Sequence, residues 1–359
     1  MKESQREASE FSSRLSLRAK RSNPLHRRMD GIASGSSPRN DNRGIALLIV
    51  LWVTTILTVM AFSFSVLTRA EGYGTLTFKE GLEKKFLAEA GIERGIMEII
   101  FRSVNRNQTL TLEGKELWKL DGTAYAIDMG SGGCAVRVID ESGKVSLNGL
   151  TDSSGIILKN LLIRQGNSSE NADIIVDSIL DWKDADDLHR LSGAENDYYR
   201  SLPGPYKARD ADFETLEELL LVRGITPEIL YGTDETKGII HFLTVHGKTA
   251  QVNLNAAPKE ILAALPGGDA AMADRIIEFR ASAETGVEDG VKELLGAAYP
   301  LMAPYVSFGP GGAPGIFSVE ATGYKDTPKK GYSILATVAF EGLREYRYVY
   351  YKSPAEIMP

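Results

Sequence analysis

An uncharged run of 23 residues, from Ile45 to Leu67, constrains this chain more than any other feature. As an α-helix it would extend about 34 Å, which is enough to cross the roughly 30 Å hydrocarbon core of a bilayer. A secretory signal peptide would be about half as long and would end at a small-x-small cleavage site. A buried core helix is the other alternative, but few core helices are uncharged over such a length. We therefore predict a transmembrane helix over residues 45–68.

Charge is divided unevenly on the two sides of this run. The residues before Ile45 hold ten Lys or Arg and five Asp or Glu, whereas the remainder holds 31 and 43, a balance of −12 within a net charge of −7. The positive-inside rule then predicts a single-pass protein with a cytoplasmic N-terminus and its body on the other side of the membrane. An acidic body does not attract nucleic acid, but it can bind divalent cations or basic partners.

A glycine stands directly before the apolar run. Gly44 would give a peptidase access to the backbone without a side-chain clash. The arrangement resembles the type IV prepilin signal, in which a prepilin peptidase cuts after Gly and the new N-terminal residue is methylated. The resemblance implies that residues 1–44 form a leader that is removed and that Ile45 becomes the methylated N-terminus. Met29 is an alternative start, which would leave a leader of 16 residues.

The fifth position after the predicted cut is Ile49, where most pilins and pseudopilins carry Glu. That Glu is usually explained as neutralising the N-terminal ammonium of a neighbouring subunit in a low-dielectric helix bundle. A subunit with no neighbour above it would not need the carboxylate. The departure therefore suits a subunit at the tip of a fibre.

Beyond the membrane the periodicity predicts an α+β fold. Residues 75–103 are helical in pattern, and Ala88, Gly91 and Gly95 would allow that helix to pack closely on a sheet or on another helix. Alternating segments predict strands of one antiparallel sheet at 124–129, 134–140, 317–324, 332–342 and 346–352. The only cysteine, Cys134, falls in the second of these and is expected to be buried. Residues 150–310 are mainly helical in pattern, so we predict a helical domain inserted into the sheet.

Two segments of that insert, 212–230 and 252–280, each combine an acidic helix, a Leu-rich turn, a glycine and a further helix. The second resembles a helix-hairpin-helix, whose backbone N–H groups can bind phosphate. Its hairpin carries Asp269 where an anion would lie, and the body is acidic, so nucleic-acid binding is not expected. A structural helical hairpin is the interpretation we prefer.

Six carboxylates crowd into 17 positions around Gly193. Such carboxylates repel one another, and Ca²⁺ binds six to eight oxygen ligands of this kind. The spacing does not fit an EF-hand, and a solvated acidic loop remains an alternative. His189 is expected at the surface, and Trp182 is expected to anchor the loop in the core. The sequence therefore predicts a calcium site among Asp181, Asp184, Asp186, Glu195, Asp187 and Asp197.

Motifs of known enzymes are lacking from the sequence. It contains no Gly-x-Ser-x-Gly, His-Glu-x-x-His or Gly-x-Gly-x-x-Gly, and Phe242 occupies the position of the first glycine of a P-loop ending at Thr249. We therefore predict that the protein is not an enzyme. A membrane-anchored hydrolase that uses the carboxylates would need a perturbed acid–base pair, which a sequence cannot show.

Four features together resemble the general secretion pathway protein K family, the large minor pseudopilin of type II secretion. They are Arg43-Gly44 before an apolar helix without Glu, GKVSLNGL, DSILDWKDADD…SGAENDYY and VNLNAAPKEILAAL. The resemblance implies a pilin-like helix on an antiparallel sheet (residues 69–149 and 311–359), an inserted helical domain (150–310) that binds calcium, and a position at the pseudopilus tip. It implies Asp181, Asp184, Asp186 and Glu195 as calcium ligands, with Asp187 and Asp197 as further candidates.

The family also implies partners and a location. The partners would be other minor pseudopilins, the prepilin peptidase and the inner-membrane secretion machinery. The chain would cross the bacterial inner membrane once, with its N-terminus in the cytoplasm and its body in the periplasm. A large body would clash with its neighbours along a fibre shaft but not at its tip. The expected role is therefore to start pseudopilus assembly and to contribute to protein export. The alternative is a membrane-anchored helix-hairpin-helix protein that binds DNA in a competence or type IV pilus system.

Overall fold

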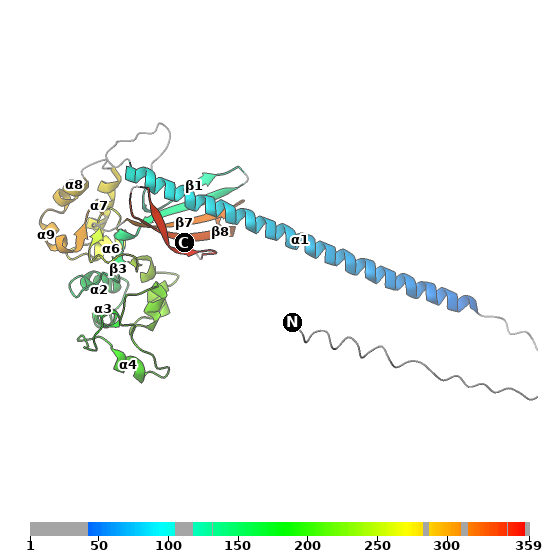
Figure 1. Cartoon of the computed structure of the whole chain (residues 1–359), viewed down its shortest axis with the longest axis horizontal. Helices are drawn as coiled ribbons and strands as arrows, with labels where there is room; N and C mark the ends of the chain where they lie inside the picture. The colour runs from blue at the N-terminus through cyan, green and yellow to red at the C-terminus, as the bar shows by residue number, and fades with distance from the viewer. Residues whose placement is uncertain are drawn as a thin grey trace, which may run out of the picture. The chain divides into compact units, whose positions relative to one another are not determined.

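The computed structural model describes residues 42–104, 118–130, 132–282, 287–309, 315–342 and 344–355, with the backbone alone at 42–44 and 282. The predicted leader, apart from its last three residues, lies outside the described residues. The chain divides into two units, Met1–Ala70 and Glu71–Pro359. The helix α1, Asn42–Val104, begins in the first unit and ends in the second (Figure 1).

In the first unit the side chains of residues 45–70 are all exposed. Of the described helices, α1 is long and apolar enough to cross a membrane, with a mean hydropathy of 2.6 over its most apolar window. None of that window is buried inside the protein, so the alternative of a core helix is wrong. By length and composition α1 is compatible with a single-pass anchor.

The second unit contains a five-stranded antiparallel sheet in the order β1-β2-β7-β8-β9. Its strands are β1 Asp121–Asp128, β2 Gly133–Asp140, β7 Ile316–Tyr324, β8 Tyr332–Phe340 and β9 Tyr346–Lys352. All five predicted strands are present. The central pair β2 and β7 are far apart in the sequence, with Val136 opposite Ala321.

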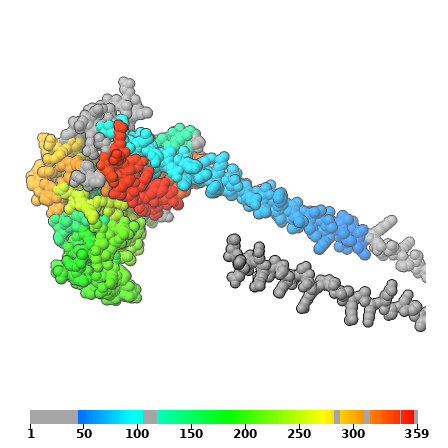
Figure 2. All heavy atoms as spheres, viewed as in Figure 1, coloured from blue at the N-terminus to red at the C-terminus, as the bar shows by residue number. Residues whose placement is uncertain are grey.

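The second half of α1 packs on this sheet with one face. Ala88, Ile92, Ile96 and Ile99 recur at helical spacing and are at most 2% exposed. A side chain at Gly91 would collide with the buried Cys134 of β2, and one at Gly95 would come within 2.6 Å of Val319 on β7. The predicted close approach through small residues is confirmed. The C-terminal strands also lie against this part of α1 (Figure 2), where Tyr348 Oη donates to Glu93 Oε1.

The segment between β2 and β7 forms a second hydrophobic core, from Val145 to Val306. It contains the helices α2 Gly155–Arg164, α3 Ser169–Lys183, α4 Asn196–Ser201, α5 Pro227–Tyr231, α6 Lys259–Ala264, α7 Ala270–Ser282, α8 Val287–Leu295 and α9 Tyr299–Met302. Short parallel pairs join β3 Val145–Ser146 to β4 Leu243–Thr244 and β5 Val252–Asn253 to β6 Val306–Ser307. The α+β fold with an inserted helical segment is therefore as predicted.

Two details of the insert depart from or refine the sequence patterns. The first helix of segment 212–230 is a 3-10 helix, η2 Leu216–Leu221, and not an α-helix. Gly224, three residues after the end of this helix, has a φ of +86°, a conformation that glycine adopts without the strain that a side chain would add. In segment 252–280 the turn between α6 and α7 is closed by Asp269, whose Oδ1 accepts from Met272 N at 2.7 Å. This carboxylate lies at the N-terminus of α7, where an anion would otherwise bind.

Candidate metal centre

The C-terminal end of α3 brings two of the predicted carboxylates to one place. Ser168 caps the start of this helix through Asn171 N, Asp181 lies in its last turn and Asp184 is its C-cap. Lys183 ties the end of α3 to the segment before α2, because its Nζ donates to Leu150 O at 2.6 Å and to Leu147 O at 3.1 Å. The GKVSLNGL segment thus supports the helix that carries the site.

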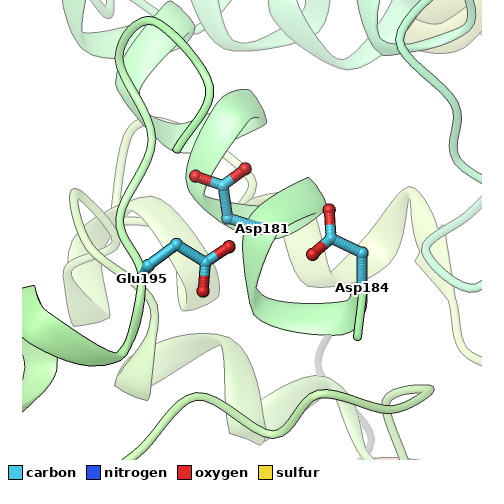
Figure 3. A group of neighbouring side chains, drawn as sticks. All are labelled: Asp181, Asp184 and Glu195. Atoms are coloured by element: carbon cyan, nitrogen blue, oxygen red, sulfur yellow. The ribbon is translucent and has the colours of Figure 1, made fainter. Parts of the chain in front are cut away.

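The chain then loops back so that Glu195, just before α4, faces the end of α3. The carboxylates of Glu195 and Asp184 turn toward each other beside Asp181 (Figure 3). One oxygen from each of the three lies within 4.8 Å of the others. We call these three residues the carboxylate cluster.

Burial makes this cluster unusual. Asp181 and Glu195 are 0% and 1% exposed. Among the described residues, neither oxygen of Glu195 has a hydrogen-bond partner, and Oδ1 of Asp184 has none either. Buried polar groups normally have partners, because an unpaired one costs about 1–3 kcal/mol. The three open oxygens, two on Glu195 and one on Asp184, are hard ligands of the kind that Ca²⁺ binds.

One arginine, Arg190, is bonded to two members of the cluster. Its Nη1 donates to Asp181 Oδ1 at 2.7 Å and to Asp184 Oδ2 at 2.6 Å, and its Nε donates to Asp152 Oδ1 at 2.8 Å. The sequence patterns did not indicate Arg190 or Asp152. No spacing rule links Asp152 to a loop residue 38 positions later, so only the fold could bring them together.

The backbone of the loop is tied to α3 as well. Arg190 N lies 3.3 Å from Asp181 Oδ2, and Ser192 N donates to Asp177 Oδ2 at 2.9 Å. A side chain at Gly193 would collide with the Asp181 carboxylate. The glycine noted in the sequence therefore lets the loop close over Asp181.

Burial and mutual repulsion disfavour the charged form of two carboxyl groups in the cluster, and their pKa values are raised. Burial, and then the charges of Asp181 and Asp184, raise the pKa of Glu195 to about 7. Burial also raises the pKa of Asp181, although Arg190 opposes this. A cation that neutralised the cluster would remove the repulsion between the carboxylates.

The other three predicted ligands lie outside the cluster and are exposed. Asp186 Oδ1 accepts from Leu188 N, and Asp187 Oδ1 accepts from Asn196 Nδ2 at 3.1 Å. Asp197 Oδ1 pairs with Nε2 of the half-exposed His189 at 2.9 Å. Asp187 is still near enough for its charge to raise the pKa of Glu195.

The predicted anchor and processing residues are also located. Trp182 is 2% exposed, and its Nε1 donates to Glu218 Oε1 at 2.9 Å, which confirms it as a core residue. Gly44 lies within α1, and the side chain of Ile45 is 60% exposed.

Comparisons with known proteins agree with this picture. Residues 143–232, which include the whole carboxylate cluster, match the family model of Type II secretion system (T2SS), protein K. The chain is 26% identical over 206 residues to type II secretion system protein K of Pectobacterium carotovorum, covering 53% of this chain and 61% of that protein. It is 25% identical over 256 residues to protein K of Pseudomonas aeruginosa, covering 67% of this chain and 73% of that protein. The chain thus spans about three fifths to three quarters of the length of these relatives.

A solved structure shares the fold. The crystal structure of the GspK-GspI-GspJ complex from the type 2 secretion system of enterotoxigenic Escherichia coli matches with a TM-score of 0.55 and 15% identity. The match covers 79% of this chain and 99% of that chain. The class of protein that fold and site define is a pilin-like α+β subunit with an inserted helical segment. Within this class, the resemblance to the type II secretion system protein K family is confirmed by the family model and by the similar sequences.

Proposed function

We propose that this protein is a minor pseudopilin at the tip of a type II secretion pseudopilus. There it would start fibre assembly and contribute to protein export across the outer membrane. The observation that carries the proposal is the pilin-like pairing of α1 with the antiparallel sheet, interrupted between β2 and β7 by a segment with its own core. The role is assembly and not catalysis.

The proposed topology follows from α1 and its flanks. Residues 45–68 would cross the inner membrane, with the basic N-terminus in the cytoplasm and the body in the periplasm. The prepilin peptidase would cut after Gly44, and Ile45 would be methylated. Because Ile49 takes the place of the usual Glu, the subunit would lack the carboxylate that pairs with a neighbour above, which supports the tip position.

The proposed partners are other minor pseudopilins and the inner-membrane machinery. The solved relative is a complex of GspK with GspI and GspJ. The corresponding interaction for this chain would be with the two equivalent minor pseudopilins of its own system. We propose further that Asp181, Asp184 and Glu195 hold a calcium ion, because carboxylate oxygens are hard ligands and three of those in the cluster have no hydrogen-bond partner among the described residues.

The processing site provides a direct test. Mass spectrometry of the mature protein should find methylated Ile45 at the N-terminus. The Gly44→Leu variant should keep its leader, because a branched side chain blocks access to the peptide bond, and it should not co-purify with the other minor pseudopilins in a fibre. The matched control, Gly31→Leu in the leader, should be cut normally. An uncut wild-type chain, or a mature end at another residue, would contradict the proposal.

A further inference from the structure

The carboxylate cluster already contains a positive charge. Arg190 is 26% exposed at its side chain, and its Nη1 alone bridges Asp181 and Asp184 at 2.7 and 2.6 Å. Charge-assisted bonds of this length are strong. An arginine guanidinium stays protonated in proteins, so Arg190 carries a full positive charge beside these carboxylates.

The third carboxylate receives nothing from this arginine. Glu195 is 99% buried, and both of its oxygens are without a partner among the described residues. Its carboxylate turns toward that of Asp184 (Figure 3), and one of its oxygens lies within 4.8 Å of an oxygen of Asp184 and of Asp181. The site is thus more than a group of acidic residues, because a buried and unpaired ligand completes it. Arg190 satisfies part of the cluster and leaves the remainder open.

We propose that Arg190 is an internal counter-ion that competes with the divalent cation for Asp181 and Asp184. It lowers the calcium affinity of the site and stabilises the insert in the absence of calcium. This inference rests on the proposed calcium site, and it adds a residue that sets the affinity of that site without being a ligand.

The competition follows from two physical facts. An oxygen that accepts a short bond from Arg190 must weaken that bond before it can coordinate a cation, and the two positive charges repel each other at close range. Asp152 offers Arg190 a partner outside the cluster, since its side chain is 79% exposed and holds Nε at 2.8 Å. The guanidinium therefore keeps one carboxylate when Nη1 releases the other two.

A lower calcium affinity shifts the response of the site to higher calcium concentrations. Calcium sites outside the cytoplasm commonly have dissociation constants of about 10⁻⁴–10⁻³ M, set by ligand charge and rigidity. An arginine bonded to two of three ligands reduces the effective ligand charge. The site would then fill and empty within the range of calcium levels found outside the cytoplasm.

The test compares arginine variants of the full chain in detergent by calorimetric titration with Ca²⁺. Arg190→Gln should bind calcium about tenfold more tightly than the wild type, because the competing charge is gone. In chelator the same variant should melt at a lower temperature than the wild type. These opposite changes distinguish a competing counter-ion from a residue that is needed only for folding, whose loss would lower both. Arg200→Gln, at an exposed position of α4, is the charge-matched control and should change neither.

Arg190→Lys keeps the charge but cannot hold the same bridging geometry. Its calcium affinity should lie between those of the wild type and Arg190→Gln, and it decides the question if the Gln variant does not fold. Equal or weaker binding in both variants would overturn the inference and leave the calcium site standing. No calcium binding by the wild type or by any variant would instead show that the proposed calcium site itself is wrong.

Discussion

At the scale of single residues, three of the six carboxylates form the cluster, and two of these, Asp181 and Glu195, are buried. Asp186, Asp187 and Asp197 are exposed and have hydrogen-bond or ion-pair partners, so they have no need of a cation. Glu195 is 1% exposed, and within the part of the chain that the structure describes its carboxylate has no hydrogen-bond partner. Burial makes the charged form of its carboxylate unfavourable. A proton and a cation would each neutralise that charge, so they would compete for this carboxylate.

The pKa of Glu195 has a definite consequence for stability. In the folded protein this pKa is about 7, above the ordinary value of 4.5. The folded state therefore binds the proton more tightly than the unfolded state, and without a cation the stability is lost as the pH rises from about 4.5 through 7. In chelator, Glu195→Gln should be about 1–3 kcal/mol more stable than the wild type at pH 8 and nearly equal to it at pH 4.5.

With calcium present the order should reverse. The wild type should gain melting temperature at pH 8 by mass action, while Glu195→Gln should gain little because a ligand is missing. Thermal melts in calcium and in chelator at the two pH values measure both effects. Glu170→Gln, the same chemical change at an exposed position of α3, should follow the wild type throughout. A Gln variant that gained as much from calcium as the wild type would exclude Glu195 as a ligand.

At the scale of helices and strands, the prediction succeeded where apolar side chains repeat regularly over a long segment. Alternation located every strand of the main sheet, and helical spacing identified the face of α1 that packs on it. The 3-10 helix η2 was missed, because Leu216–Leu221 has the composition of an α-helix. In so short a segment, packing against the rest of the protein decides between the two kinds of helix. The two-residue parallel pairs are too short to leave any pattern.

The candidate site was predictable in place but not in composition. Acid density indicated the end of α3, where three of the six carboxylates do come together, since carboxylates so close in sequence cannot lie far apart. Which of them face inward depends on the return of the loop at Gly193, and the role of Arg190 depends on contacts with Asp152 from another segment. These are long-range contacts, to which local patterns are blind.

The contact between α1 and the sheet makes its own prediction. Gly91→Ala should destabilise the protein by about 1–3 kcal/mol in urea unfolding, because the added methyl meets Cys134 and Ala321 with no room to move. Gly81→Ala is the matched control on the same helix, where nothing lies within 4 Å. It should be neutral or stabilising by up to about 1 kcal/mol, because alanine favours the helix. Equal effects of the two changes would show that the close contact at Gly91 contributes nothing.

At the scale of the whole molecule, the second unit has two hydrophobic cores. One lies between α1 and the sheet, and the other fills the insert. They are joined where Asp140, at the end of β2, accepts from Ser142 N and lies within 3.4 Å of Asn253 Nδ2. The carboxylate cluster belongs to the insert, so a bound cation would act on that core first.

Amide hydrogen exchange can measure this division. Removal of calcium with a chelator should increase exchange in residues 184–199, where the loop and α4 depend on the cluster. The central strands β7 and β8 should keep their protection, because their core does not include the cluster. Loss of protection in both regions together would mean that the two cores unfold as one. Unchanged exchange in residues 184–199 would mean that no cation stabilises the loop.

The distance in sequence between β2 and β7 also determines the order in which the sheet can form. A newly made chain can pair β1 with β2 at once, but the other edge of β2 has no partner until β7 has been synthesised, after the whole insert. Until then the edge of β2 at which Val136 pairs with Ala321 stays uncovered, and so does the part of α1 that packs on β7 at Gly95. Open strand edges are sites of aggregation. The insert, whose buried core residues all lie within residues 145–306, can collapse first. Closure of the sheet by the C-terminal strands would then be the last and slowest step in the maturation of each subunit.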